Sequence, residues 1–422
     1  MKKLLTLFTL LLIITNGTSQ SFSEDFANIE QKVIEWRRYF HQNPELSNRE
    51  FNTAKKIASH LKSLGIKTEE NIAKTGVVGI LEGDKKGKVV ALRADIDALP
   101  VVERNDLSFK STVKSSYLNK DVGVMHACGH DTHIAILMGV AEILAKNKDQ
   151  IKGTVKFIFQ PAEEGAPEGE EGGAELMIKE GVLKNPDVDV IFGLHIASGY
   201  DVGTISYKAG GTMAAAQSFK INVKGKQSHG SRPWGGVDPI IVSAKIIDGL
   251  QTIISREAEL TNEAAVITVG KIDSGVRNNI IPESAEMIGT IRTLDYNMQK
   301  VINDRMKEMV PAIAKAYKAE ATIEIQKGLP ITFNDIELTK KVFPTLQKVA
   351  GPNNVNEIKA ITGAEDFSFF QQKIPGFYFF LGGKTIGNEN PFPHHTPDFM
   401  IDESGMLLGV KTMTQLAIDY LN

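Results

Sequence analysis

The chain has 422 residues, of which 42% are hydrophobic and 23% are charged, and its formal net charge is −3 at pH 7. This composition is ordinary for a globular protein, and the length suits two or three domains. The small negative charge gives no support to a nucleic-acid or anionic-membrane partner. A single cysteine excludes a disulfide within the chain.

Residues 1–19 have the pattern of a secretory signal peptide. Lys2 and Lys3 precede an apolar run from Leu4 to Ile14, and small or polar residues follow. The run is too short to cross a bilayer comfortably, and a membrane anchor is the alternative interpretation. We therefore expect an exported protein, periplasmic or secreted, with no stable membrane span after cleavage.

Strand and helix patterns alternate through the first half of the mature chain. Apolar spacing first predicts helices within residues 26–65. Strands are then predicted at 77–81, 89–92, 155–159 and 188–192, with helices at 132–145 and 174–180. This alternation predicts an α/β fold with a mostly parallel central sheet flanked by helices, which binds its ligands at the carboxyl ends of the strands.

The middle of the chain has the βαββαβ order of a ferredoxin-like domain. We expect residues 213–327 to form a lid or dimerisation domain, inserted into a catalytic metal-binding domain made of residues 20–212 and 328–422. After the insertion, the pattern returns to a helix, a buried strand and a closing helix. The inserted elements are predicted at 217–224, 238–254, 264–272, 285–293, 297–317 and 321–325, and the closing ones at 336–349, 376–381 and 405–421.

The only cysteine lies in the histidine-rich segment 125–133. Cys128 and His130 point the same way if the segment is extended, and Gly129 lets the backbone bend towards an ion. A thiol among imidazoles and a carboxylate suits a soft or borderline divalent cation. A lone cysteine is also common as a small buried residue, so a metal site needs further support.

That support comes from acids and imidazoles elsewhere in the chain. Several of them directly follow predicted strands, and two histidines lie near the end of the sequence. Because ligands sit at the carboxyl ends of parallel strands, these side chains are expected at the same edge of the sheet. The candidates are Asp97, Glu163, Glu164, His195, His394 and His395.

These residues belong to a longer series of motifs that closely resembles the dinuclear-metal aminoacylase and carboxypeptidase family. Within that family the series looks like the hippurate-hydrolase branch, with hippurate hydrolases, N-acetyl-amino-acid deacetylases and indole-3-acetyl-amino-acid hydrolases. The match runs in order over nearly the whole mature chain. Its motifs are residues 93–100, 125–133, 160–165 and 193–195, Asn279 with Pro282, and residues 289–292, 363–367 and 395–397.

The resemblance implies a role for each matching residue of the metal site. Glu163 would be the general base, and Asp97 would orient the metal ligands from behind. Reversed roles for Glu163 and Glu164, and His394 in place of His395, are the alternatives. Two divalent ions per chain, zinc or manganese first with cobalt or nickel as further candidates, would be bound by Cys128, His130, Glu164, His195 and His395.

The resemblance also implies substrate contacts in the inserted domain. Arg292 would grip the substrate carboxylate with Asn279 as its helper, although a surface ion pair is the alternative for Arg292. His229 would stabilise the oxyanion in a neighbouring subunit's active site. Trp234 stands where this branch commonly has a histidine, which puts the shape of the pocket in doubt. An open sheet edge, at residues 217–224 or the neighbouring strand, would join two chains in a homodimer.

The implied function is hydrolysis of the amide bond of a small N-acyl-amino acid, of the hippurate, N-acetyl or indole-acyl type, to a carboxylic acid and an amino acid. A dipeptidase or carboxypeptidase with the same metal centre, acting on short peptides, is the closest alternative. A binding protein on this scaffold would be expected to have lost ligands or Glu163, and none is lost. A thiol hydrolase would need Cys128 as a metal-free nucleophile with His130 as its base.

Overall fold

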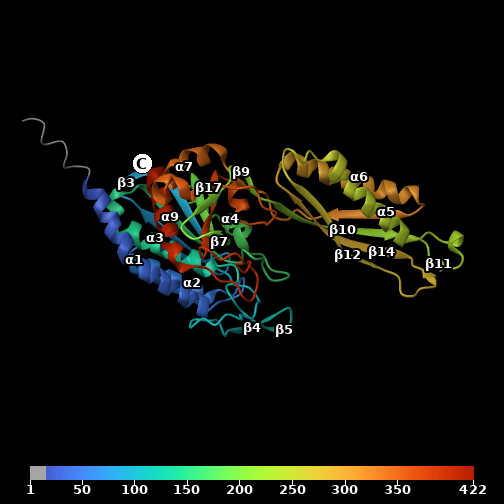
Figure 1. Cartoon of the computed structure of the whole chain (residues 1–422), viewed down its shortest axis with the longest axis horizontal. Coiled ribbons are helices and arrows are strands. Elements are labelled where there is room, and N and C mark those ends of the chain that lie inside the picture. Colours follow the sequence, from blue (N-terminus) through green and yellow to red (C-terminus); the bar gives the residue numbers. More distant parts are fainter. Residues whose placement is uncertain (1–15) are drawn as a thin grey trace, which may run out of the picture. The chain divides into compact units, whose positions relative to one another are not determined.

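The computed structural model describes residues 16–422, and their side chains from residue 22 onwards. The predicted signal peptide therefore lies almost entirely outside the described residues. None of the helices in the described part combines the length and apolar composition that a membrane crossing requires. The chain forms two compact units, the first made of Met1–Tyr207, Asp335–Ile358 and Lys373–Asn422, the second of Lys208–Asn334 and Lys359–Gln372 (Figure 1). The domain functions expected from the sequence stay a prediction, because compactness alone does not test them.

In the described residues, the first unit is built on an eight-stranded mixed sheet with the order β1-β2-β6-β3-β7-β18-β8-β17. The central neighbours β6, β3, β7 and β18 are parallel, while β1 and β2 pair antiparallel at one edge. The expected mostly parallel sheet is confirmed. The strands are β1 (Lys67–Ile72), β2 (Gly76–Glu82), β3 (Lys85–Asp95), β6 (Lys152–Gln160), β7 (Val190–Asp201), β8 (Ile205–Tyr207), β17 (Val355–Glu357) and β18 (Gly376–Lys384).

Helices cover this sheet and explain why its central strands read as continuous apolar runs. All of β18 from Gly376 to Gly383 is buried, as expected for a strand covered on both faces. The helix α3 (His130–Lys146) packs against β3 and lies between α1 (Asn16–Gln42) and α9 (Met406–Leu421). The helices α1 and α9 also contact each other, so the first and last helices of the described chain lie side by side (Figure 1). Other helices of this unit are α2 (Phe51–Ser63), α4 (Gly173–Lys179) and α7 (Ile336–Ala350).

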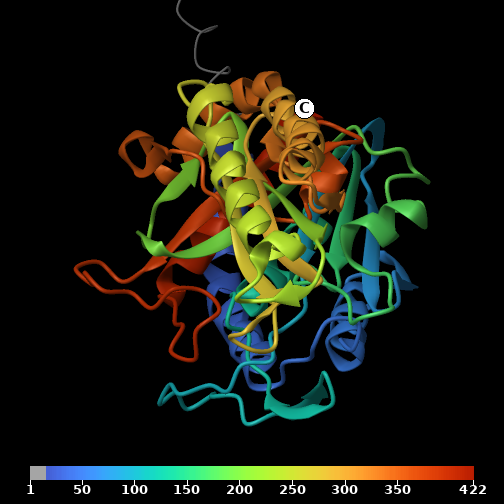
Figure 2. The ribbon, with the colours of Figure 1, turned by 90° about the vertical axis from the view of Figure 1, so that its right-hand side faces the viewer.

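The second unit contains a four-stranded antiparallel sheet with the order β12-β14-β10-β15. Two helices, α5 (Pro239–Thr252) and α6 (Tyr296–Ala316), lie side by side on one face of it (Figures 1 and 2). This is the expected ferredoxin-like arrangement. The strands are β10 (Ala215–Lys224), β12 (Ala265–Ser274), β14 (Ser284–Thr293) and β15 (Glu320–Ile325).

Of the two expected positions for an open sheet edge, residues 217–224 are wrong, and a neighbouring strand, β15, is an edge. Residues 217–224 do not form an open edge, because β10 pairs with β14 on one side and with β15 on the other. The open edges of this sheet are β12 and β15. A strand that begins a ferredoxin-like domain is central in space, although its position in the sequence does not show this.

Candidate metal centre

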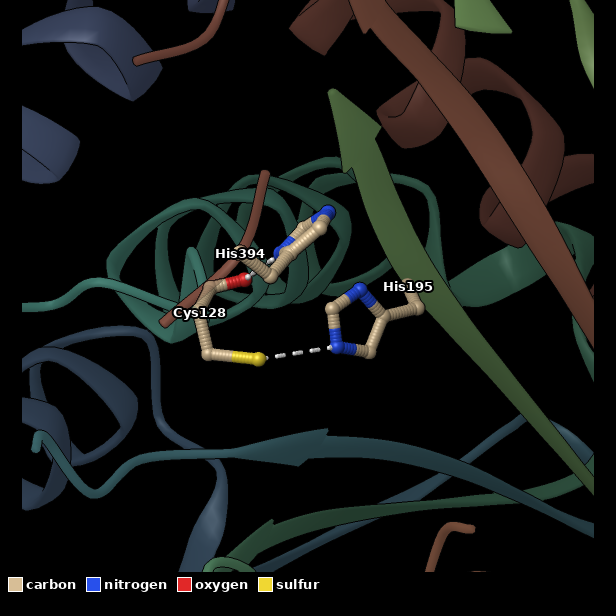
Figure 3. Close-up of side chains that lie close together, drawn as sticks. All are labelled: Cys128, His195 and His394. Atoms are coloured by element: carbon tan, nitrogen blue, oxygen red, sulfur yellow. Dashed lines mark hydrogen bonds between the residues drawn. The ribbon is translucent and has the colours of Figure 1, made fainter. Parts of the chain in front are cut away.

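The predicted metal ligands of the first unit converge on the thiol of Cys128. Its Sγ atom lies 3.4 Å from Nε2 of His195 and 3.3 Å from Nε2 of His395 (Figure 3 shows the pair with His195). Nε2 of His395 is also 3.0 Å from Oε1 of Glu164, which lies 4.0 Å from Nε2 of His130. The five residues therefore form one continuous cluster.

Local backbone geometry brings Cys128 and His130 into this cluster. Gly129, between them, has a φ of 93° and precedes the first residue of α3. A Cβ atom at position 129 would lie 2.4 Å from Cγ2 of Ile196, which is far closer than two carbons can approach. Glycine is therefore required here, both for the left-handed backbone and for the close packing against β7.

The cluster has the chemistry of an ion site. Among the described side chains, Nε2 of His130 is buried and has no hydrogen-bond partner. Burial and the nearby carboxylates of Glu164 and Glu163 hold the pKa of the Cys128 thiol well above its usual range. A divalent cation would satisfy the imidazole and stabilise the thiolate, and a mixed S, N and O donor set suits a borderline metal.

Asp97 fixes the orientation of this cluster. Its Oδ1 lies 3.2 Å from Nδ1 of His130, so the other ring nitrogen of His130 faces the cluster. Its Oδ2 accepts hydrogen bonds from the backbone N–H of Glu164 at 3.0 Å and from the hydroxyl of Ser47 at 2.7 Å. Burial alone would raise the pKa of Asp97, but these hydrogen bonds lower it overall. Asp97 thus contacts two candidate ligands, His130 and Glu164, and its expected role in orienting them stays a prediction.

Two further histidines have both of their ring nitrogens bound to protein groups. Nε2 of His133 accepts the N–H of Ile196 at 2.8 Å, and its Nδ1 faces Asp95. Nε2 of His394 accepts the N–H of Ser198 at 3.2 Å, and its Nδ1 donates to the carbonyl oxygen of Cys128 at 3.1 Å (Figure 3). His394 lies as close to the thiol cluster as a ligand would, but it has no free nitrogen. This geometry favours His395 over His394.

The tautomer of His195 agrees with a ligand role. Its Nδ1 donates to the carbonyl oxygen of Ile196 at 2.6 Å, which leaves Nε2 without a proton and directed at Cys128. Glu163, the candidate base, is close to the same group of atoms. Its Oε2 lies 3.9 Å from Nε2 of His130, and its side chain is 10% exposed.

Sequence reasoning did not single out the connection between α1 and α2. Ser47, Asn48 and Glu50 from this connection contact Asp97, the acidic loop around Glu170, and Ala162, respectively. In the sequence these residues look like an ordinary polar turn. The one usable signal was a carboxylate immediately before an amphipathic helix, and helix capping would have explained it equally well.

In the second unit, the structure brings His229 and Asn279 together. β11 (Ser228–His229) pairs with β13 (Ile280–Ile281), and the N–H of Gly230 donates to the carbonyl oxygen of Asn279 at 2.9 Å. The side chain of His229 is exposed, and its Nδ1 accepts the N–H of Ser231 at 3.0 Å.

Arg292 is far from this pair within the same chain. It lies opposite Ala216 and Val266, near the end of β14, whereas β13 precedes the start of that strand. Ser284 and Arg292 are eight positions apart, which corresponds to about 26 Å of extended strand. Asn279 and Arg292 of one chain are therefore too far apart to bind the same small molecule, and their expected joint role stays a prediction.

Known proteins resemble the chain over almost its whole length. It is 44% identical over 405 residues to "Thermostable carboxypeptidase 2" of Saccharolobus solfataricus, covering 96% of this chain and 99% of that protein. "N-acetyl-L-cysteine deacetylase" of Bacillus subtilis is 37% identical, over 91% of this chain and 86% of its own length. The crystal structure of the Bacillus subtilis YXEP protein, a dinuclear metal binding peptidase from the M20 family, has a TM-score of 0.78 and 34% identity. It covers 94% of this chain and 99% of that one.

The family profile agrees with these relatives and with the resemblance found in the motifs. Residues 91–419 match peptidase family M20/M25/M40, which includes all the candidate residues described above except Ser47, Asn48 and Glu50. Together with the identities to full-length relatives, this match establishes that the chain is a member of peptidase family M20/M25/M40, a hydrolase of amide or peptide bonds.

Proposed function

We propose that the protein is a metal-dependent amidohydrolase that cleaves the amide bond of an N-acyl-amino acid, releasing a carboxylic acid and an amino acid. The observation that carries this proposal is the cluster of five candidate ligands around Cys128 with Glu163 beside it. Relatives named as a deacetylase and as a carboxypeptidase make peptide hydrolysis the second candidate. The N-terminal pattern supports export of the mature chain to the periplasm or beyond.

We assign the five ligands to two divalent ions, zinc or manganese first. Cys128 would be best suited to hold both ions, because a thiolate has lone pairs for two. A single catalytic zinc ordinarily uses three protein ligands and one open position, so five converging ligands favour a pair of ions. When bound, such ions polarise a carbonyl group and lower the pKa of a water molecule.

Glu163 carries the proton in this proposal. It takes a proton from the attacking water and passes it to the nitrogen of the departing amino acid. The hydrogen bond from the backbone N–H of Glu164 to Asp97 fixes the short segment that carries Glu163, the proposed base, and Glu164, the proposed ligand. The adjacent glutamates therefore divide two tasks, proton transfer and ion binding.

Arg292 is assigned to the substrate carboxylate. Its side chain is half-buried, and within residues 22–422 its guanidinium has neither an ion pair nor a side-chain hydrogen bond. This argues against the surface ion pair that was the alternative. A planar guanidinium can bind a carboxylate through two parallel hydrogen bonds, which selects substrates with a free carboxyl end.

We further propose a homodimer through the second unit. The edge strand β12 exposes Val266 and Ile272, 38% and 49% of whose surfaces are accessible. A groove of about 430 Å³ lies between this strand and α5, lined by Ile247, Gln251 and residues 267–272. Pairing of two such edges would cover both features. His229 and Asn279 of the partner copy would then serve one site together with this chain's Arg292.

The choice between His395 and His394 is tested by metal content. We expect His395→Ala to weaken ion binding by at least about tenfold, because a ligand is lost. His394→Ala should retain the ions and lose about 1–3 kcal/mol of stability, because the N–H of Ser198 loses its acceptor. Elemental analysis and chelator competition measure the first effect, and urea unfolding measures the second. Loss of metal from His394→Ala alone would reverse the assignment.

Glu163→Gln should keep the ions and lower kcat by about a hundredfold or more, because the proton carrier is removed. Glu164→Gln is the matched control, since it is the same substitution one residue away, and it should weaken ion binding instead. Near-normal turnover by Glu163→Gln would disprove the base assignment. Hydrolysis that survives chelation but not alkylation of Cys128 would favour a thiol mechanism instead.

Esterifying the substrate carboxylate should lower kcat/KM by about 30–150-fold, because a charge-assisted hydrogen bond to Arg292 is lost. Arg292→Ala should cleave acid and ester at similar rates, and Arg292→Lys tests whether charge alone suffices. The substrate panel comprises acetyl-, benzoyl- and indole-acetyl-amino acids beside dipeptides. Faster cleavage of dipeptides than of every acyl conjugate would place peptide hydrolysis first.

A mixture of His229→Ala and Glu163→Gln chains tests whether sites are shared. Each variant alone should be nearly inactive. After subunit exchange, about a quarter of wild-type activity should return, since half of the dimers are mixed and one of their two sites is intact. Each variant exchanged with itself is the control. If verified exchange restores no activity, His229 acts in its own chain or outside catalysis.

A further inference from the structure

The connection between α1 and α2 contains a buried carboxylate that the proposed reaction does not use. Glu50 is fully buried and is the residue immediately before α2. Its side chain does not cap that helix. The helix is capped instead by Glu45, whose carboxylate accepts the N–H groups of Asn52 and Thr53 at 3.2 and 2.8 Å. The burial of Glu50 therefore needs another explanation.

Both oxygens of Glu50 bind groups outside the helix. Oε1 accepts the backbone N–H of Ala162 at 3.0 Å, and Oε2 accepts the hydroxyl of Thr75 at 2.6 Å. Thr75 belongs to the turn between β1 and β2, and Ala162 is the residue immediately before Glu163. One side chain thus joins the β1–β2 turn to the segment that carries both candidate glutamates.

The backbone of Ala162 is strained. Its φ is 53°, in the left-handed region that costs free energy for any residue with a Cβ atom. The residue is also buried, so its N–H would be expensive to leave unpaired. Strained backbone of this kind persists only where the surroundings hold it. The contact from Glu50 supplies the acceptor for that N–H.

We propose that Glu50 is a positioning residue that holds the left-handed turn at Ala162 and thereby directs Glu163 and Glu164 towards the Cys128 cluster. This inference rests on the proposed function, which assigns the base and ligand roles to these two glutamates. Asp97 holds the same segment from the other side, through the N–H of Glu164. The segment 162–164 is therefore tethered at two backbone N–H groups by two different carboxylates.

A glutamine should replace Glu50 well. Burial and the neighbouring charge of Asp97 raise the pKa of Glu50 to about 8, which favours the neutral form of its carboxyl group. The amide oxygen of a glutamine can accept the N–H of Ala162, and its NH₂ group can donate to Thr75. Alanine can do neither, and aspartate keeps the carboxyl group but is one methylene shorter.

The test compares Glu50→Gln, Glu50→Ala and the helix-cap control Glu45→Ala. We expect Glu50→Ala to lower kcat and weaken ion binding by about 10–100-fold each, with KM little changed. Glu50→Gln should stay within about threefold of the wild type, as expected when its hydrogen bonds are kept. Glu45→Ala should lower the melting temperature without changing kcat or ion affinity, because it affects only the end of α2.

A second substitution tests the strain directly. Ala162→Gly removes the Cβ atom that makes the left-handed turn costly. It should therefore restore part of the lost kcat and ion affinity when it is combined with Glu50→Ala. Equal losses in the single and double variants would show that Glu50 does not act through this turn.

Other results would also overturn the proposal. They are a Glu50→Ala variant that loses only stability, and a Glu50→Gln variant as damaged as Glu50→Ala. If Glu50→Ala does not fold, Glu50→Gln and Glu50→Asp are compared instead. A positioning role predicts higher kcat and ion affinity for Glu50→Gln, whereas a requirement for charge predicts higher values for Glu50→Asp. Ion affinity is measured without substrate. Failure of the wild type to hydrolyse any acyl-amino acid would therefore count against the proposed function and leave the test of Glu50 intact.

Discussion

The arrangement of the candidate site depends on the hydrogen bonds that the carboxylate of Asp97 accepts. Asp97 lies just beyond β3 and contacts the first residue of α3, the segment after β6 and the α1–α2 connection. These four pieces of chain are far apart in the sequence. A buried carboxylate needs several donors to remain charged, and here the donors are the groups that must be oriented. Burial of the Asp97 carboxylate thus requires that the groups which donate hydrogen bonds to it keep fixed positions.

The same constraint extends outward from the cluster. Asp95, two residues before Asp97, is fully buried and pairs with Arg93 and His133. His133 in turn accepts the N–H of Ile196, the residue after His195, so Asp95 is connected through an imidazole to the backbone beside a second candidate ligand. Removing one partner from such a network leaves a buried group unpaired, which costs more than the net value of one hydrogen bond. Because of this free-energy cost, the candidate ligands are expected to be held rigidly.

The second unit meets a different constraint, which is the length of an extended strand. Its β10–β14 ribbon continues into β11 and β13, so His229 and Asn279 lie beyond one end of the sheet and Arg292 lies near the other (Figure 1). Side chains separated in this way cannot contact the same small molecule from one chain. Substrate recognition by all three residues therefore requires a second copy, which connects the proposed chemistry with the proposed assembly.

The order of strands and helices could be predicted from the amino-acid sequence, because periodic burial is a local property of a strand or helix. The sequence also singled out Cys128, His130, Glu163, Glu164 and His195 as candidates, because their residue types limit their chemistry. The motif resemblance placed His395 first and left the adjacent His394 as the alternative. The tertiary structure favours His395, because backbone groups of Cys128 and Ser198 occupy both nitrogens of His394.

The central position of β10, the separation of Asn279 from Arg292 and the contact between Glu50 and Ala162 were likewise decided only in three dimensions. Strand register and hydrogen bonds between residues more than a hundred positions apart leave no periodic trace in the chain. In the amino-acid sequence, a polar residue that forms hydrogen bonds in the interior cannot be told from a polar residue that faces water.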